Sequence, residues 1–266
     1  PIPKIGAALE PKNCRARRSR EGRFLGAPAR VAPTRQAEPS MLCECAMEPG
    51  LYAIVDADAL ERGGFDLLTV ARGVLEARPR VLQLRAKSWS DRRVVDALTQ
   101  LRALVPKETW LFANDRADLA RITGCDGVHV GQTDLPPDVL RAHFPELRFG
   151  LSTHDTEQFE RALELGLDYV ALGPIFATTS KENPDPVVGV ASLARLAEKA
   201  RARNVPVVAI GGISLENVAQ LTGHSTLVAA IGALLPAANS GDVAAEVGER
   251  ARALTRAFVA GLDANA

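Results

Sequence analysis

One loop of the chain gathers hydroxyl groups and an ammonium group in a pattern suited to binding an anion. An apolar run at residues 169–172 predicts a strand that breaks at Gly173-Pro174. Hydroxyl and backbone N–H groups donate hydrogen bonds to a phosphate, and a lysine adds a compact positive charge. The loop therefore indicates a phosphate site, although polar clusters also occur in loops that only face solvent. Its polar residues are Thr178, Thr179, Ser180 and Lys181.

A second set of anion-binding side chains ends the apolar run at residues 81–85. Gln83, Arg85 and Lys87 alternate along the chain, so an extended strand directs all three to the same side. In a closed barrel this alternation separates inward from outward residues. An amide, a guanidinium and an ammonium facing one way are suited to grip an anion. A solvated strand end is the alternative, but Gln83 and Arg85 fall inside an otherwise apolar run.

Two isolated aspartates follow the next two apolar runs and suit a hard cation. Asp115 ends one run beside Asn114, and Asp134 follows the next. Magnesium typically takes one or two carboxylates and completes its octahedron with substrate phosphates and water. Helix capping is the alternative for each aspartate alone, because Asp115 precedes a helical pattern and Asp134 precedes Pro136, a favoured first-turn residue. The two roles do not exclude one another.

Later strand ends add small polar residues and glycines. Ser152 and His154 follow a fifth apolar run, Gly211-Gly212 a seventh, and an eighth ends near Gly232. Glycine lets backbone N–H groups approach a ligand closely. His154 and His129 are expected to be structural. No Ser-His-Asp set and no catalytic cysteine stands out, so the inventory is two anion sites beside two carboxylates. It indicates an enzyme that joins two phosphorylated small molecules, with pyrophosphate as the leaving group.

Eight strand-like apolar runs separated by helical patterns position these residues. Eight strand–helix units in roughly 210 residues are typical of an α/β protein of the (β/α)8 TIM-barrel class. A doubly wound open sheet is the alternative, but no G-x-G-x-x-G follows the first strand. In a barrel, the loops after the carboxyl ends of the strands converge, which brings the polar residues together. The expected strands span residues 51–57, 81–85, 110–115, 127–130, 148–153, 169–173, 207–212 and 226–232.

Capping residues predict several helix boundaries. Asp155 is expected to cap the start of a helix, and Gly166 its end. Ser214 is expected to cap a short helix at residues 215–221. A last helix, rich in Ala, Glu and Arg, is expected at residues 243–262.

The composition narrows the class of protein. The formal net charge is zero, so charge gives no reason to expect a nucleic acid as partner. No apolar run reaches about 18 residues, so no membrane span is expected. The four cysteines show no zinc-binding or redox spacing, which fits a reducing, cytoplasmic environment. They are Cys14, Cys43, Cys45 and Cys125, the last expected to be a small buried residue.

Residues 1–48 differ from the rest of the chain. They show no sustained periodicity, hold six prolines and carry a basic cluster between Arg15 and Arg23. Such a composition cannot bury enough apolar surface to offset the entropy lost on ordering. We therefore expect a disordered, basic, proline-rich tail at 1–48 and a barrel domain at 49–266.

Six motifs, in order along the chain, resemble those of the thiamine phosphate synthase family. They are QLRAK (83–87), NDRADLA (114–120), DGVHVGQTDLP (126–136), GLSTHD (150–155), LGPIFATTSK (172–181) and VAIGGIS (208–214). The resemblance covers about residues 50–262. It implies a transferase of thiamine biosynthesis that uses Mg²⁺ and joins a pyrimidine carried as a methyl pyrophosphate to a thiazole phosphate.

The resemblance also implies roles for single residues. Asp115 and Asp134 match the magnesium ligands, and Arg85, Lys87 and Lys181 would stabilise the leaving pyrophosphate. The contacts to the pyrimidine pyrophosphate match Gln83, Arg85, Lys87, Asn114, Ser152 and Lys181. The thiazole phosphate site matches Thr178, Thr179, Ser180 and Gly212.

One position departs from the family pattern. The family usually carries an apolar residue followed by serine in the loop after the eighth strand, and the equivalent pair here is expected to be Val228-Ala229. Losing one hydrogen bond to a charged group costs about 1.5–3 kcal/mol, so weaker binding of the thiazole phosphate is expected. Two alternatives stay open: a related thiazole tautomerase, and a member that binds a thiamine precursor without turnover. Whether the chain forms a homo-oligomer is also open.

Overall fold

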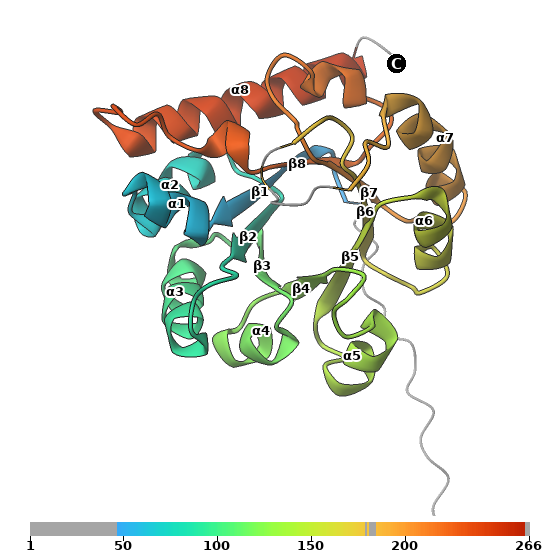
Figure 1. Cartoon of the computed structure of the whole chain (residues 1–266), viewed down its shortest axis with the longest axis horizontal. Coiled ribbons are helices and arrows are strands. Elements are labelled where there is room, and N and C mark those ends of the chain that lie inside the picture. Colours follow the sequence, from blue (N-terminus) through green and yellow to red (C-terminus); the bar gives the residue numbers. More distant parts are fainter. Residues whose placement is uncertain (1–46, 179, 181–184, 264–266) are drawn as a thin grey trace, which may run out of the picture. The chain divides into compact units, whose positions relative to one another are not determined.

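The computed structural model describes residues 47–178, 180 and 185–263, which form a closed barrel of parallel strands. Each strand pairs with the next in the chain, and β1 (Gly50–Asp56) pairs with β8 (Leu227–Ala230) to close the ring, with the helices outside it (Figure 1). The expected TIM barrel is therefore confirmed, and the open-sheet alternative is wrong. The other strands are β2 (Val81–Arg85), β3 (Trp110–Asn114), β4 (Gly127–Val130), β5 (Arg148–Thr153), β6 (Tyr169–Leu172) and β7 (Val207–Ile210).

Every expected strand end lies within two residues of an observed one. The largest differences are at the carboxyl ends of β7 and β8, where the apolar run continues past the last ladder residue. Gly211 and Gly212 are therefore loop residues, as is Ile231 after β8, and Gly232 begins the 3-10 turn that follows. This matters because the loops at these ends line the site.

Helices cover the outside of the barrel, and none of those described is both long and apolar enough to span a membrane. Helix α8 crosses α2 (Figure 1), and Gly73 permits this approach because a Cβ there would collide with the Ala244 carbonyl. The helices are α1 (Ala57–Gly63), α2 (Leu67–Glu76), α3 (Asp91–Leu104), α4 (Ala117–Thr123), α5 (Pro137–His143), α6 (Thr156–Ala162), α7 (Val190–Arg201) and α8 (Val243–Asp263), with the 3-10 turns η1 (Val218–Leu221) and η2 (Gly232–Leu234).

The capping expectations are confirmed at one residue and wrong at two. Asp155 caps α6, its Oδ1 accepting from the Gln158 N–H at 2.8 Å. Gly166 does not end α6, which stops at Ala162; with φ of 61° it serves the turn that follows. Ser214 does not cap a helix at 215–221, because only the single 3-10 turn η1 forms there.

The barrel interior holds an inner cluster of buried side chains that point toward the axis. Aromatic side chains fill much of its volume, and Tyr169 lies over Gly150, the residue paired with it on β5. A Cβ at Gly150 would collide with the phenol of Tyr169, so the glycine creates the space for that ring. The inner cluster comprises Tyr52, Ile54, Val81, Phe112, Tyr169, Ala171, Val208, Leu227 and Ala229.

The tail expected at 1–48 lies outside the described residues except for its last two. Met47 packs against the inner cluster, and Glu48 forms an ion pair with Arg80. The fold therefore begins before β1. Thr179 and Lys181 of the expected phosphate loop also lie outside the described residues.

Candidate active site

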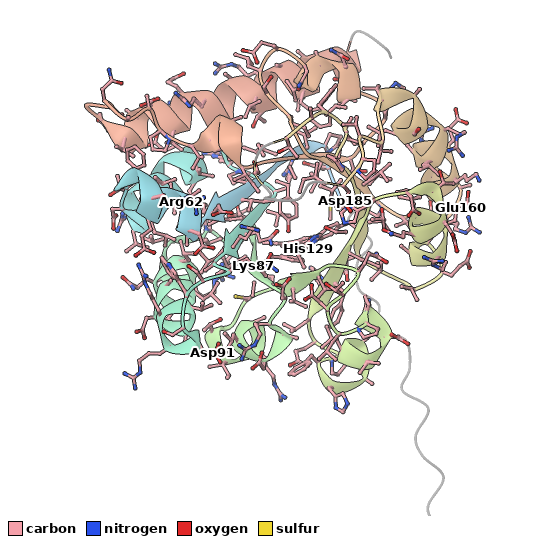
Figure 2. All side chains as sticks on the ribbon, viewed as in Figure 1. Arg62, Lys87, Asp91, His129, Glu160 and Asp185 are labelled. Atoms are coloured by element: carbon pink, nitrogen blue, oxygen red, sulfur yellow. The ribbon has the colours of Figure 1, made fainter. Side chains whose placement is uncertain are left out.

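The polar residues that follow the strands meet at the carboxyl end of the barrel. A cavity of about 390 Å³ lies there, reached from β2, β3, β4 and β5. A smaller cavity of about 80 Å³ adjoins it on the side of β6, β7 and β8, and Ser152, Ser180 and Ile231 line both. Figure 2 shows Lys87 and His129 toward the middle of the ring, whereas Asp91 lies on the outside. Residues far apart in sequence thus form one site.

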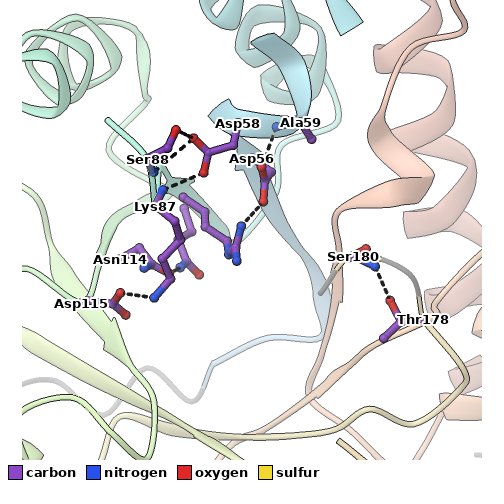
Figure 3. A network of polar contacts seen from close by, with 11 residues as sticks. Asp56, Asp58, Ala59, Lys87, Ser88, Asn114, Asp115, Thr178 and Ser180 are labelled. Carbon is purple, nitrogen blue, oxygen red and sulfur yellow. Dashed lines mark hydrogen bonds and ion pairs between the residues drawn. The ribbon is translucent and has the colours of Figure 1, made fainter. Parts of the chain in front are cut away.

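The strand-two set is organised by a buried carboxylate. Asp56, the last residue of β1, is 4% exposed and forms an ion pair with Arg85 at the end of β2 (Figure 3). Gln83 is only 2% exposed, so the solvated-end alternative is wrong for this strand. Gln83, Arg85 and Lys87 all line the larger cavity, as their alternation predicts. Arg85 is therefore held in place before any ligand arrives.

A second carboxylate anchors the loop after β2. Asp58 accepts hydrogen bonds from the backbone N–H groups of Lys87, at 2.8 Å, and Ser88, at 3.3 Å, and from the Ser88 hydroxyl at 2.5 Å (Figure 3). Burial raises the pKa of Asp58, but these bonds outweigh it and hold the pKa below its usual range. Sequence reasoning missed Asp56 and Asp58, although both follow directly on an apolar run.

Asp115 points into the cavity from a tight turn. Its φ of 62° is unusual for a residue other than glycine, and aspartate tolerates it better than most. The turn is fixed by two backbone bonds of 2.8 Å, from Asp115 N–H to the His129 carbonyl and from Arg116 N–H to the Asn114 carbonyl. The Asp115 carboxylate forms an ion pair with the Lys87 ammonium (Figure 3). Backbone strain at Asp115 indicates that the direction of its carboxylate is constrained by function.

Neither aspartate caps a helix. The N-cap of α4 is Arg116 and that of α5 is Pro136, both without a side-chain cap. Asp134 instead turns back into its own loop, where Oδ2 accepts from the Gly131 N–H at 2.7 Å. The alternative reading of these residues as caps is therefore wrong.

The two aspartates form a small acidic centre. Burial raises the pKa of Asp115, Lys87 opposes the rise, and the neighbouring Asp134 carboxylate adds to it. In the described part of the chain, no three His, Cys, Asp or Glu side chains cluster in a way that could hold a metal ion. Two carboxylates with open space beside them fit Mg²⁺, which keeps waters and takes oxygens from a substrate phosphate.

The smaller cavity has the expected features of a phosphate pocket on the described part of its wall. Thr178 and Ser180 line it, and the Ser180 N–H donates to Thr178 Oγ1 at 3.2 Å (Figure 3). Gly211 and Gly212 have φ of 97° and 64°, and a Cβ on Gly212 would collide with the Ala177 carbonyl. A Cβ on Gly211 would likewise collide with Pro174, so the close contact between the loops after β6 and β7 depends on glycine at both positions.

The strand-eight pair was expected in the loop after the strand, but the structure places it within β8. Val228 and Ala229 lie inside β8 and are buried, Val228 in the outer core and Ala229 in the inner cluster. Of the residues that follow β8, Ile231 lines both cavities, and Gly232 lines a neighbouring cavity beside Asp56 and Arg85. The apolar run does not reveal where the ladder ends, so the sequence placed this pair in the loop. The residues after the ladder, Ile231 and Gly232, likewise carry no side-chain hydroxyl.

Polar side chains also cross the barrel interior in one connected row. Gln83 bonds to Asn114 at 2.9 Å and to Tyr52 at 2.8 Å, and the two tyrosine hydroxyls are 2.8 Å apart. His129 Nδ1 lies 2.8 Å from the Tyr169 hydroxyl, and its Nε2 lies 2.8 Å from Ser152 Oγ. We call this row the interior hydrogen-bond chain; its members are Asn114, Gln83, Tyr52, Tyr169, His129 and Ser152. Sequence reasoning missed both tyrosines, which have the pattern of ordinary core residues.

Comparisons with known proteins agree with this geometry. A family model described as thiamine monophosphate synthase matches residues 51–234. A thiamine-phosphate synthase of Koribacter versatilis is 46% identical over 172 residues, covering 64% of this chain and 80% of that protein. One of Anaeromyxobacter dehalogenans is 42% identical over 214 residues, covering 77% of this chain and 92% of that protein.

A solved structure supports the same relationship. Thiamine phosphate pyrophosphorylase from Pyrococcus furiosus matches with a TM-score of 0.65 and 27% identity, covering 79% of this chain and 96% of that one. The segment matched by the family model runs from β1 to η2 and so contains every described residue of the two cavities named above. The resemblance seen in the motifs is therefore confirmed, and the chain belongs to the thiamine monophosphate synthase family.

Proposed function

We propose that the chain is a thiamine phosphate synthase, which condenses an aminopyrimidine methyl pyrophosphate with a thiazole phosphate to give thiamine phosphate and pyrophosphate. One observation carries the proposal: cations from β2 and a pair of carboxylates share a cavity that adjoins a hydroxyl- and glycine-lined pocket. A pyrophosphate and a second phosphate can therefore be held side by side. Membership of the family and the names of the relatives support the same reaction.

The protein's main task in this reaction is to stabilise the leaving group. The thiazole nitrogen attacks the pyrimidine methylene carbon, and the bond from that carbon to the pyrophosphate oxygen breaks. The aminopyrimidine delocalises positive charge, which favours a dissociative path through a pyrimidine-methyl cation. Arg85, fixed by Asp56, and Lys87 face the cavity where the negative charge develops. Lys181 has the same role in the proposal.

Asp115 and Asp134 are the residues that would hold Mg²⁺. When bound, the ion neutralises charge on the departing pyrophosphate. Lys87 pairs with Asp115 in the absence of other cations, so it keeps this carboxylate neutralised in the free protein. The tight turn at Asp115 and the Gly131 N–H bound to Asp134 keep both carboxylates aimed at the cavity.

The two substrates occupy different walls of the site in this proposal. Gln83, Asn114 and Ser152 line the larger cavity beside the acidic centre, where the pyrimidine ring would lie. The thiazole phosphate would lie in the smaller cavity, whose lining includes Thr178, Ser180, Gly212 and Ile231. Thr179 would contact the same phosphate in this proposal. Positioning of both reactants, rather than acid–base chemistry, then supplies most of the rate.

A discontinuous assay tests the proposal. Purified protein is mixed with both substrates and Mg²⁺, and the product is converted to fluorescent thiochrome. We expect thiamine phosphate that disappears on adding EDTA, and a turnover reduced at least about 100-fold in Asp115→Ala. Asp118→Ala is the matched control, because Asp118 lies on α4 in an ion pair with Arg116 and lines neither cavity.

Other outcomes would redirect the assignment. Binding of both substrates by calorimetry without product would favour a non-catalytic precursor binder. Isomerisation of a thiazole phosphate without condensation would favour the tautomerase. Near-normal turnover of Asp115→Ala would remove the magnesium assignment while leaving the reaction in place.

A further inference from the structure

The interior hydrogen-bond chain connects the two walls of the larger cavity through the middle of the barrel. Its ends, Asn114 and Ser152, both line that cavity, and the residues between them are buried. Within the described residues, no buried side-chain nitrogen or oxygen lacks a hydrogen-bond partner. A fully satisfied buried network is rigid and specific, because an unmade bond in it is costly. The direction of each hydrogen bond in this network therefore constrains the direction of the next.

The amide of Gln83 sets the direction at one end. Its Nε2 donates to Asn114 Oδ1, and its Oε1 accepts from the Tyr52 hydroxyl. Burial raises the pKa values of Tyr52 and Tyr169 far above neutrality, so each phenol keeps its single proton. Because the Tyr52 proton is directed to Gln83, the Tyr52 oxygen must accept the proton of Tyr169 across their 2.8 Å contact.

The same reasoning continues to the other end. The Tyr169 proton points to Tyr52, so the Tyr169 oxygen accepts from His129 Nδ1. A neutral imidazole carries one donor and one acceptor, which leaves Nε2 to accept the proton of Ser152. His129 is 9% exposed and stacked on Tyr169, so charging the ring would carry a desolvation cost.

We propose that the interior hydrogen-bond chain is proton-ordered, so that Ser152 presents an acceptor to the cavity and Asn114 presents the N–H groups of its amide. The surroundings of Asn114 favour this order over its reverse. Asp115 and Asp134 line the same cavity as Asn114, and an N–H group is stabilised near carboxylates where a carbonyl oxygen is not. Reversal would require both amides to flip, both phenols to rotate and His129 to change tautomer together.

The order selects the kind of pyrimidine that binds, and only this step rests on the proposed function. An aminopyrimidine offers an amino donor next to a ring-nitrogen acceptor. That edge complements the Ser152 acceptor and the Asn114 donor. An oxopyrimidine offers the inverse pattern, with a carbonyl acceptor next to a ring N–H. Its ring cannot simply turn over, because the pyrophosphate on the neighbouring carbon must stay near Arg85 and Lys87.

Tyr52, Tyr169 and His129 are therefore positioning residues in this proposal. They act by fixing the protons of Ser152 and Asn114. A purely structural role would require only that these three side chains fill space and hydrogen-bond to one another. It would not need a particular tautomer of His129. His129 was expected to be structural. The proposal instead predicts which of its ring nitrogens carries the proton, and this can be measured.

The first test is nuclear magnetic resonance of the substrate-free protein labelled with ¹⁵N-histidine. We expect His129 to carry its proton on Nδ1, whereas neutral histidine in solution mostly carries it on Nε2. The signal is assigned by its loss in His129→Gln among the four histidines of the chain. A proton on Nε2 overturns the proposed order whatever the activity of the protein.

The second test compares substrates in a variant that cuts the chain. Tyr52→Phe removes one hydroxyl and disconnects the two amides from His129. We expect the wild type to prefer the aminopyrimidine pyrophosphate over its oxo counterpart by on the order of a thousandfold or more in kcat/KM, and Tyr52→Phe to lose at least about tenfold of this preference. Thr222→Val is the control. It also removes one buried hydrogen bond, to the Phe258 carbonyl, but Thr222 lines neither cavity.

These tests distinguish the proposed proton order from the proposed reaction. Unchanged selectivity in Tyr52→Phe overturns the positioning role. An Nδ1 proton in a protein without thiochrome activity would support the proton order and remove the proposed reaction. In that case calorimetric binding of the two pyrimidine pyrophosphates replaces kinetics, and equal affinities would overturn the selectivity.

Discussion

The Lys87 ammonium forms an ion pair with the Asp115 carboxylate, between the segments that follow β2 and β3 (Figure 3). Lys87 is expected to bind the pyrophosphate, and Asp115 the magnesium ion. Lys87 thereby offsets part of the repulsion between Asp115 and Asp134. A divalent cation on these carboxylates would compete with Lys87 and release it toward the pyrophosphate. Metal binding and readiness of the lysine are thus coupled through one carboxylate.

Removing the Asp115 charge should lower the activity but keep or raise the melting temperature. The pKa of Asp115 is raised in the folded protein, so its contribution to stability is fully present below the unfolded pKa and is lost as pH rises through the folded pKa. We expect Asp115→Asn, without Mg²⁺, to melt at the same or a higher temperature than wild type at neutral pH, and the difference to vanish below about pH 4. Thermal unfolding followed by circular dichroism measures it.

Asp118→Asn is a control for which the opposite change in stability is expected. The hydrogen bond from Arg116 holds the pKa of Asp118 below its usual range, so its stabilising contribution is present at neutral pH and is lost in acid. We expect this variant to be slightly less stable than wild type at neutral pH and fully active. A lower melting temperature for Asp115→Asn as well would show that the Lys87 ion pair outweighs burial and repulsion.

Adding a hydroxyl at Gly232, just after β8, should strengthen thiazole phosphate binding. A Cβ on Gly232 would meet Ser180 Oγ at 3.9 Å, an ordinary contact, so the fold has room for a side chain. We expect Gly232→Ser to lower the KM for the thiazole phosphate about tenfold, the low end for a hydrogen bond to a charged group. Steady-state kinetics at saturating pyrimidine pyrophosphate measures it. Gly232→Ala controls for the added carbon, and an equal KM in both variants would contradict a role for the hydroxyl.

Gly212 should be intolerant of any side chain. A Cβ there would collide with the Ala177 carbonyl and push the residue before Thr178 out of place. We expect Gly212→Ala to lose about 1–2 kcal/mol of stability from its left-handed backbone and, in addition, to raise the KM for the thiazole phosphate about tenfold or more.

Gly223→Ala separates the two effects. Gly223 has φ of 78° with nothing within 4 Å of an added Cβ, so only the backbone cost applies. We expect a similar loss of stability with an unchanged KM. A KM that also stays unchanged in Gly212→Ala would argue against a phosphate pocket between these loops.

Cys125 should be chemically silent in the native protein. Burial raises the pKa of the Cys125 thiol to about 11, and its sulfur lies 3.3 Å from Thr123 Oγ1. The thiolate is therefore scarce and enclosed near neutral pH. In a variant that keeps Cys125 as its only cysteine, we expect a thiol reagent at about pH 8 to react only after denaturant is added. Rapid labelling of the native variant would show that the segment between α4 and β4 opens readily.

The sequence predicts the scaffold and the chemistry of the strand ends well. Alternation in β2 places Gln83 and Arg85 inward, and isolated aspartates after β3 and β4 meet as expected. These signals are local: a period of two residues, or a charge directly after an apolar run. The site follows once the strand ends are known to converge.

The rest could not be read locally. Tyr52 and Tyr169 are separated by 117 positions, and only closure of the barrel brings their hydroxyls together. The pair Val228-Ala229 was expected in a loop and lies in β8, because an apolar run continues smoothly from ladder to loop. Asp56 looks like a strand end until Arg85 is found beside it. Each case depends on a distance between strands that no sequence window contains.

The empty position at Gly150 has a consequence for how this barrel can diverge. Because the Tyr169 ring occupies the space that a Cβ at position 150 would need, position 150 cannot gain a side chain while that ring is in place. A lineage that gains a side chain at 150 must first give up the phenol at 169, and with it the link from His129 to Tyr52. Substitution at Gly150, which has no side chain, is therefore linked to the chemistry of the pocket.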